Sequence, residues 1–165
     1  MQDAMPAMPP TAVLLGLLGL LPFLGCAGGA MFLQGDKAAT YLAALIAYGA
    51  VVLAFLGAVH WGFALLLNPA GAGQKRLAAK RLVCGVIPAL VGWLALLLHA
   101  AMGPTTALLV LIAGFTATLY VEHGMARTGF LPRGYMILRW GLTAVVLVTL
   151  GLTTIVRIMG FCLIF

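Results

Sequence analysis

Residues 39–67, which read ATYLAALIAYGAVVLAFLGAVHWGFALLL, decide the fold class of this chain. The stretch contains no Asp, Glu, Lys or Arg, and roughly 20 apolar residues are enough for a helix to cross the hydrocarbon core of a bilayer. Hydrocarbon offers no hydrogen bonds to the backbone, so a single segment can cross it only as a helix. The sequence therefore predicts a transmembrane helix over residues 39–67.

The rest of the chain has the same character. Of its 165 residues, 64% are hydrophobic and 7% are charged, and the mean hydropathy is +1.19, whereas about a quarter of the residues in soluble domains are charged. We therefore expect an all-α, polytopic membrane bundle of five transmembrane helices that forms a single domain over residues 1–165. The predicted helices span about 11–33, 39–67, 82–102, 105–121 and 136–159, and the predicted loops between them include two basic ones, 68–81 and 122–135.

The distribution of Lys and Arg predicts the orientation, because loops rich in these residues stay on the cytoplasmic side. One side of the predicted membrane carries seven of them and the other side carries two, Lys37 and Arg157. The seven are Lys75, Arg76, Lys80, Arg81, Arg127, Arg133 and Arg139. The N-terminus is thus expected in the cytoplasm and the C-terminus in the periplasm, in the inner (cytoplasmic) membrane of a bacterium.

Several functional classes are not favoured by the sequence. The net charge of +6 does not indicate nucleic acid, because the basic residues lie between apolar spans and not along one face. The three cysteines are far apart, without metal-ligand spacing, and no phosphate-binding loop or nucleophile elbow is present. We therefore expect no catalytic residues, no metal, no cofactor and no enzymatic activity.

An alternative for the first span is a cleaved lipoprotein signal ending at Cys26. Signal peptides begin with a positively charged region, and residues 1–10 contain no Lys or Arg. We therefore interpret the first span as a retained helix.

A few polar residues lie within the predicted spans, where ionisable groups are costly unless they are paired. His60, Glu122 and Arg139 all fall toward the predicted cytoplasmic leaflet. Together with Trp61 and Tyr135 they form a hypothetical ligand-binding set. The alternative is structural: Glu122 and Arg139 would reach the membrane interface, and His60 would bond to the carbonyl of a neighbouring helix.

Small residues in the second span predict close helix packing. Gly49 and Gly57 share the face of His60 at helical spacing, and glycines in membrane helices allow neighbours to approach closely. A second row of small residues recurs at every fourth position and comprises Ala50, Ala54 and Ala58. In the fifth span, the stripe that runs from Arg139 through Thr143 and Thr153 to Arg157 is partly polar, so we expect it to face the protein interior.

Short motifs in the chain resemble a known family. Tyr48-Gly49-Ala50 and the segment from Phe55 to Gly62 carry most of the resemblance. Further matches are Leu21-Pro22-Phe23, Pro88-Ala89-Leu90 with Trp93, and Pro132, Tyr135, Leu138-Arg139 and Leu142-Thr143. Together they resemble the domain-of-unknown-function 3429 family, small bacterial membrane proteins that are similar to the mitochondrial transmembrane protein 69. The chain departs from that pattern at Glu122, where the family is expected to have Asp, and at Gly134, where it is expected to have an aromatic residue. The resemblance implies a membrane protein and no particular activity.

Three functions remain open from the sequence. The first is a non-catalytic accessory or assembly role, with other membrane proteins as partners within the lipid bilayer. The second is binding of a lipid, a quinone or another small amphiphile in a pocket at the inner leaflet. The third is transport of a small solute or a proton, with His60 and Glu122 as relay groups.

The topology can be tested with reporter fusions at the two ends of the chain. Since five spans place the ends on opposite sides, a cytoplasm-active reporter should work at the N-terminus and a periplasm-active reporter at the C-terminus. Activity of both fusions in the same compartment would contradict the number of crossings. Activity in opposite compartments but in the reverse sense would contradict the orientation alone.

Overall fold

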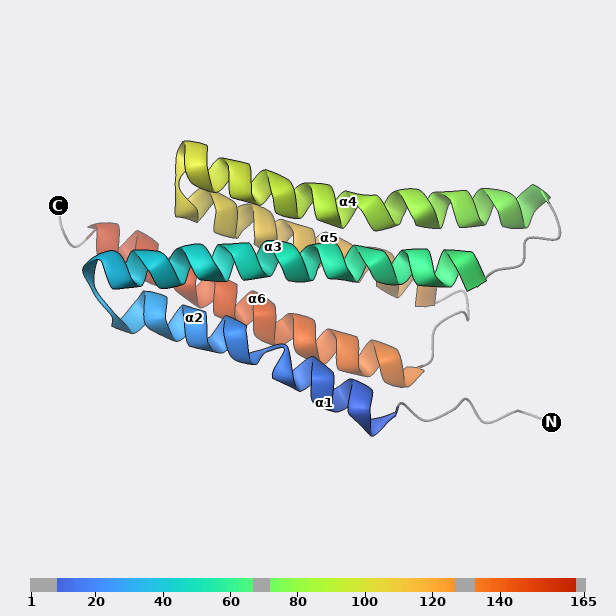
Figure 1. Ribbon diagram of the computed structural model, residues 1–165, viewed down its shortest axis with the longest axis horizontal. Helices are drawn as coiled ribbons and strands as arrows, with labels where there is room; N and C mark the ends of the chain where they lie inside the picture. Colours follow the sequence, from blue (N-terminus) through green and yellow to red (C-terminus); the bar gives the residue numbers. More distant parts are fainter. Residues whose placement is uncertain (1–8, 67–71, 127–132, 163–165) are drawn as a thin grey trace. The chain divides into compact units, whose positions relative to one another are not determined.

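The chain is helical throughout the part that the computed structural model describes, residues 9–66, 72–126 and 133–162, apart from short connections (Figure 1). The described helices are α1 (Pro10–Leu18), α2 (Leu21–Phe32), α3 (Gly35–Leu66), α4 (Ala72–Met102), α5 (Pro104–Ala126) and α6 (Arg133–Cys162). Within these described residues, five segments are long and apolar enough to cross a membrane, namely Pro10–Phe32, Gly35–Gly62, Ala79–Met102, Pro104–Met125 and Gly134–Gly160. The predicted all-α class and the five spans are confirmed.

The first span is divided into α1 and α2 (Figure 1). Pro22 has no backbone N–H and its ring crowds the carbonyl four residues earlier, and α1 ends at that residue, Leu18. The chain continues through Gly19 and Leu20, whose N–H groups donate to the carbonyls of Leu15 and Leu17. The helix is therefore interrupted one turn before Pro22.

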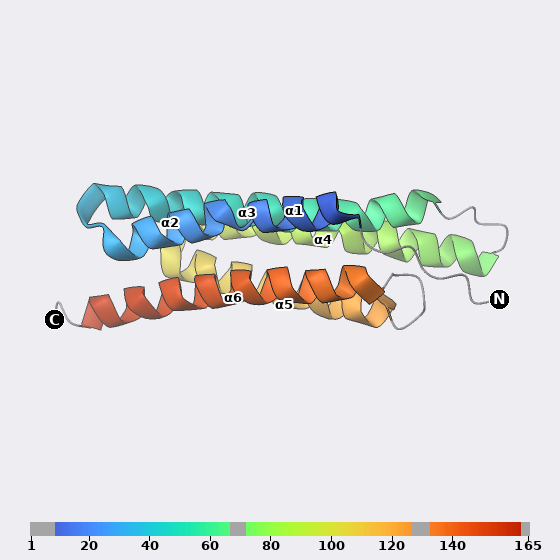
Figure 2. The same cartoon turned by 90° about the horizontal axis from the view of Figure 1, so that it is seen from below.

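Two glycines make the tight turns between helices. Gly35 has a φ of +61° and opens α3, and Gly103 has a φ of +93° between α4 and α5. Residues with a Cβ rarely adopt this backbone conformation, so glycine suits both positions. Figure 2 shows the chain reversing direction between α2 and α3. Asp36 then lies in the first turn of α3, where a negative charge stabilises the helix dipole.

The helices are longer than the apolar pattern predicts. α4 begins at Ala72 rather than near residue 82, and α5 continues to Ala126 rather than ending near residue 121. The predicted basic loops, 68–81 and 122–135, are thus partly helical, while residues 68–71 and 127–132 lie outside the described part. Hydropathy reports where a helix meets lipid. At α4 the helix includes residues before that point because the Lys, Arg and Ala residues there are good helix formers.

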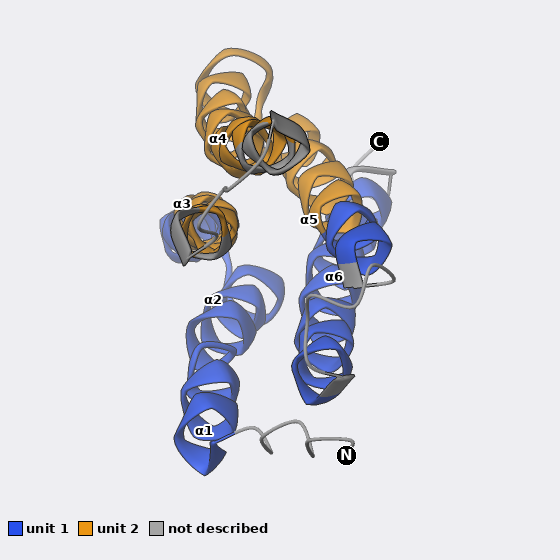
Figure 3. Cartoon of the chain, turned by 90° about the vertical axis from the view of Figure 1, so that its right-hand side faces the viewer, with its two compact units in different colours: residues 1–42, 119–165 blue, residues 43–118 orange. Residues whose placement is uncertain are grey.

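The helices group into two compact units (Figure 3). The first comprises residues 1–42 and 119–165, and in it α1 and α2 pack against α6. Gly16 makes this contact close, since a Cβ added there would lie 2.8 Å from a methyl group of Leu142. Phe23 and Ala27 of α2 are buried. This unit therefore joins the first and the last spans of the chain.

The second unit comprises residues 43–118 and is built on glycines that bring helix backbones together. A Cβ added at Gly57 of α3 would overlap with the carbonyl oxygen of Gly85 on α4. One added at Gly92 of α4 would lie 2.8 Å from the carbonyl oxygen of Ala50, and one at Gly49 would lie 2.9 Å from the side chain of Leu111 on α5. Gly49, Gly57 and Ala50 therefore all lie at helix contacts.

The alanine row of α3 and the partly polar stripe of α6 differ in how far they are buried. Ala50 is buried, Ala54 is half-buried and Ala58 is exposed, so the alanine row is covered at one end. On α6, Thr143 and Thr153 are fully buried, which confirms that this stripe faces inward. The hydroxyl of Thr153 donates to the carbonyl of Thr149 at 2.9 Å, so the helix itself satisfies this polar group.

We expect Gly57→Ala to destabilise the protein, because the new methyl group meets a backbone carbonyl that has no room to move. Overpacking of this kind costs about 1–3 kcal/mol. Gly62→Ala is the matched control, since Gly62 lies on the same helix and no described atom is within 4 Å of its added Cβ. Thermal unfolding in detergent, followed by circular dichroism, should show a lower Tm for Gly57→Ala only. Equal Tm values for the two variants would contradict the close contact.

Candidate functional site

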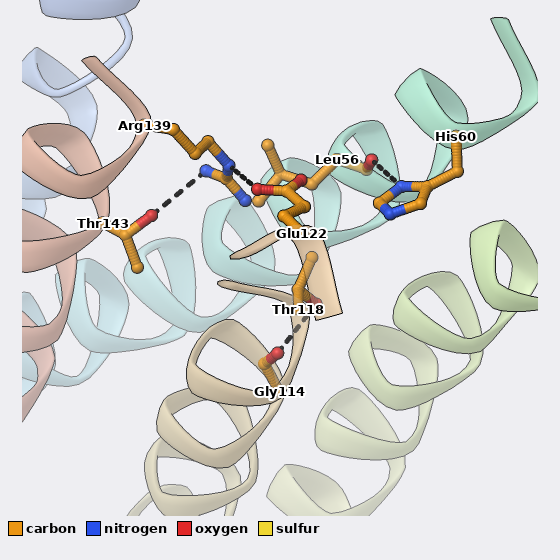
Figure 4. Close-up of polar contacts among 7 residues, drawn as sticks. All are labelled: Leu56, His60, Gly114, Thr118, Glu122, Arg139 and Thr143. Carbon is orange, nitrogen blue, oxygen red and sulfur yellow. Dashed lines mark hydrogen bonds and ion pairs between the residues drawn. The ribbon is translucent and has the colours of Figure 1, made fainter. Parts of the chain in front are cut away.

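The ends of two neighbouring spans hold a buried ion pair in the first unit. Glu122 lies in the last turns of α5 and Arg139 in the second turn of α6. The Nε of Arg139 donates to Oε2 of Glu122 at 2.6 Å (Figure 4). Glu122 is 2% exposed and Arg139 is 7% exposed. The interpretation that both side chains extend to the membrane interface is therefore wrong, because each is enclosed by protein.

Thr143 completes this cluster. It follows Arg139 by one helical turn, and residues four apart lie on the same face of a helix. Its Oγ1 accepts a hydrogen bond of 3.2 Å from Nη1 of Arg139 (Figure 4). Thr143 is itself buried, so α6 supplies both the cation and one of its acceptors.

The pair lies just inside the apolar spans. Glu122 is three residues before the end of the span Pro104–Met125, and Arg139 is five residues after the start of Gly134–Gly160. At 1.5 Å per residue both groups lie roughly 5–8 Å from the span ends. Two opposite charges at this depth stabilise each other, whereas either charge alone would be costly. The ion pair therefore holds the end of α5 against the start of α6.

Two polar atoms of the ion pair, its open atoms, have no hydrogen-bond partner among the described residues. Oε1 of Glu122 and Nη2 of Arg139 are buried, and neither has a hydrogen-bond partner among the described residues. A buried donor or acceptor without a partner costs about 1–3 kcal/mol, and more when it is charged. The cluster therefore presents one acceptor and one donor that its own residues leave unsatisfied.

Aromatic residues surround this end of the unit. Tyr135 precedes Arg139 by one turn on α6 and interacts electrostatically with both Glu122 and Arg139. His123 and Trp140 meet edge to face, with ring centroids 5.9 Å apart and planes at 89°. Both are exposed, as is typical of aromatic side chains near a membrane interface.

The five predicted ligand-binding residues fall into both units. The structure brings Glu122, Tyr135 and Arg139 together in the first unit. His60 and Trp61 belong to α3 in the second unit. His60 is 4% exposed, and its Nδ1 lies 3.3 Å from the carbonyl oxygen of Leu56 (Figure 4). That carbonyl belongs to its own helix and not, as the structural interpretation predicted, to a neighbour.

Trp61 connects two helices of the second unit. Its Nε1 donates to the carbonyl of Leu82 on α4 at 3.1 Å, and its ring lies against Gly85. The side chain is 45% exposed. This geometry gives Trp61 a packing role at the contact between α3 and α4.

Among the described residues, no group of three or more His, Cys, Asp or Glu is arranged to hold a metal ion.

Comparisons with known proteins identify the family. Residues 8–155 match the sequence profile described as "Protein of unknown function (DUF3429)". The chain belongs to this family. It is also 36% identical over 143 residues to transmembrane protein 69 of Xenopus tropicalis, an alignment that covers 86% of this chain and 53% of that protein. The chain thus spans about half the length of this relative. No solved structure matches it.

The family match covers the whole ion-pair cluster of this DUF3429 protein, from Glu122 to Thr143. The family is one of unknown function. The sequence and the comparisons agree on a membrane protein with several spans.

Some contacts of the DUF3429 protein were not anticipated as site contacts. Thr143 belongs to the predicted inward stripe of the fifth span. Its spacing of four from Arg139 is the signal by which the sequence could have identified it as a hydrogen-bond partner of Arg139. The contact between His123 and Trp140 joins two helices, and each residue is adjacent in sequence to a member of the ion pair. A predicted pairing of Glu122 with Arg139 would therefore also have predicted the contact between His123 and Trp140.

A double-mutant cycle tests the ion pair of the DUF3429 protein. Removing one partner leaves an uncompensated buried charge, so Glu122→Gln or Arg139→Gln alone should lower the free energy of unfolding by about 3–5 kcal/mol. The double variant should lose clearly less than the sum of the two, because no charge remains unpaired. Reversible unfolding in mixed micelles measures each value. Arg76→Gln, at an exposed residue of α4, is the control and should have little effect, and strict additivity would contradict the pairing.

Proposed function

We propose that this DUF3429 protein is a non-catalytic accessory or assembly partner of a complex in the bacterial cytoplasmic membrane. Its partners are other integral membrane proteins, which it contacts through a helix face that its own chain leaves uncovered. The bias of Lys and Arg supports an N-terminus in the cytoplasm. The observation that carries the proposal is the contrast between two kinds of glycine in its spans.

Most glycines in the spans of the second unit are in close contact. Added Cβ atoms at Gly49, Gly57, Gly85, Gly92 and Gly114 would each come within 3 Å of a neighbouring helix. Glycine in the middle of a helix is less stable than alanine by roughly 0.5–1 kcal/mol, and close packing against another membrane helix offsets this loss. In the second unit, glycine within a span is therefore mostly associated with helix contact.

Gly25 and Gly28 of α2 differ from that group. No described atom lies within 4 Å of the Cβ that either glycine would carry. Both lie on the face opposite the buried Phe23 and Ala27, at helical spacing from Leu21 and Phe32. Leu21 is 60% exposed and Phe32 is 83% exposed. The face is thus a notch of two glycines between two large apolar side chains.

The notch suits a transmembrane helix of another protein. Lipid tails adapt to any apolar surface, whereas two backbones approach closely only where side chains are small. The opposite face of α2 packs against α6, and the ion pair between Glu122 and Arg139 fastens α6 to α5. The helix that carries the notch is therefore held in place by its contact with α6. A fixed surface favours the binding of a protein helix over that of lipid tails.

Affinity purification in mild detergent tests the proposal. The wild-type chain should recover a stoichiometric membrane partner, and Gly25→Leu with Gly28→Leu should reduce its yield about tenfold or more, because leucine in a close helix contact costs on the order of 1–3 kcal/mol. Gly141→Leu is the matched control, since Gly141 is a similarly open glycine on α6. It should recover the partner as the wild type does.

Two results would contradict this function. One is a chain that purifies alone and monodisperse in several detergents. The other is a partner whose yield falls equally in the notch variant and in the Gly141→Leu control. A second copy of the chain as the only partner would replace the accessory role with self-association.

A further inference from the structure

We propose that the Glu122–Arg139 pair is also a binding site for the hydroxyl-bearing head of a neutral amphiphile, such as a quinol or a diacylglycerol. The starting point is the pair's two unsatisfied atoms. Oε1 of Glu122 can only accept a hydrogen bond, and Nη2 of Arg139 can only donate one. A hydroxyl group does both, so its chemistry matches the two unsatisfied atoms of the pair.

The charge of the site selects against an anionic head. Glu122 and Arg139 are bonded to each other at 2.6 Å, so their charges largely cancel for a third group. An anion brought to Nη2 would also approach the carboxylate of Glu122 and would lose its hydration. A neutral hydroxyl avoids that repulsion and loses far less hydration.

The depth of the pair suits an amphiphile. Both residues lie within the last or first two turns of their apolar spans, which is where the polar part of a lipid-soluble molecule meets its tail. The exposed rings of His123 and Trp140 mark the same level on the outside of the helices. A head at this depth can reach the pair while its tail stays among the acyl chains.

Both open atoms are buried in this structure. A head therefore reaches them only when a neighbouring side chain moves. Tyr135 lies one turn from Arg139, interacts with both charges and is partly exposed. Tyr135 is therefore one described side chain in the neighbourhood of the pair.

Three probes with short chains test the chemistry on the full-length protein in phosphatidylcholine nanodiscs. Dioctanoylglycerol and decylubiquinol carry neutral hydroxyl heads, and dioctanoyl phosphatidate carries an anionic head on the same chains as the first probe. Native mass spectrometry and tryptophan fluorescence titration report binding. At least one neutral probe should bind about tenfold more tightly than phosphatidate, and the probe that binds better distinguishes a quinol from a glycerolipid. Binding of neither neutral probe, or equal binding of phosphatidate, overturns the proposal and leaves water as the occupant.

A charge-removing variant separates a binding role from a structural one. Glu122→Gln keeps the shape of the side chain and leaves the charge of Arg139 uncompensated. This variant should therefore bind phosphatidate more tightly than the neutral probes, by roughly tenfold or more. Arg157→Gln, near the other end of α6, should bind all three probes as the wild type does. An unchanged preference in a folded Glu122→Gln variant overturns the proposal. Should that variant fail to fold, the wild-type comparison of the three probes decides. The notch on α2 is not involved, so this result is independent of the partner experiment.

Discussion

The need to satisfy every polar group without water governs this protein. In hydrocarbon, backbone N–H and C=O groups must bond within the helices, and the described chain consists of helices and short turns. The same need explains the hydroxyl of Thr153, which bonds to its own helix, and the pairing of Glu122 with Arg139. Oε1 of Glu122 and Nη2 of Arg139 depart from this rule, as do Nδ1 of His99 and Nε of Arg157.

Glycine has three distinct uses in the chain. At Gly35 and Gly103 it allows backbone angles that other residues rarely adopt. At Gly57 it allows one helix backbone to lie against another. At Gly25 and Gly28 it does neither within the described structure, and these two glycines form the surface of the proposed partner contact.

The ion pair and the notch give the first unit two separate features. The pair fastens α5 to α6 near one end of the spans, while the notch lies on the uncovered face of α2, with α6 on its other side. A binding head at Glu122 and Arg139 would bear on the contact between α5 and α6.

Hydropathy and spacing alone determine much of this protein. The number of spans, the helical class, the interruption caused by Pro22 and the inward face of α6 all follow from local rules, because lipid dictates helix formation and the helical period dictates the faces. Periodicity also placed Gly49 and Gly57 on one packing face. It does not identify which neighbour a face will meet, and it does not fix the helix ends, since α4 begins before its apolar segment and α5 continues to Ala126.

Only the tertiary structure decided which polar groups come together. Glu122, Tyr135 and Arg139 share a site because α5 and α6 are fastened at one end, whereas His60 bonds to its own helix in the other unit. The structure alone also showed that one oxygen and one nitrogen of the pair stay open. The physical reason is that a sequence specifies the face on which a side chain lies, while its partner and the geometry of their atoms depend on how separate helices pack.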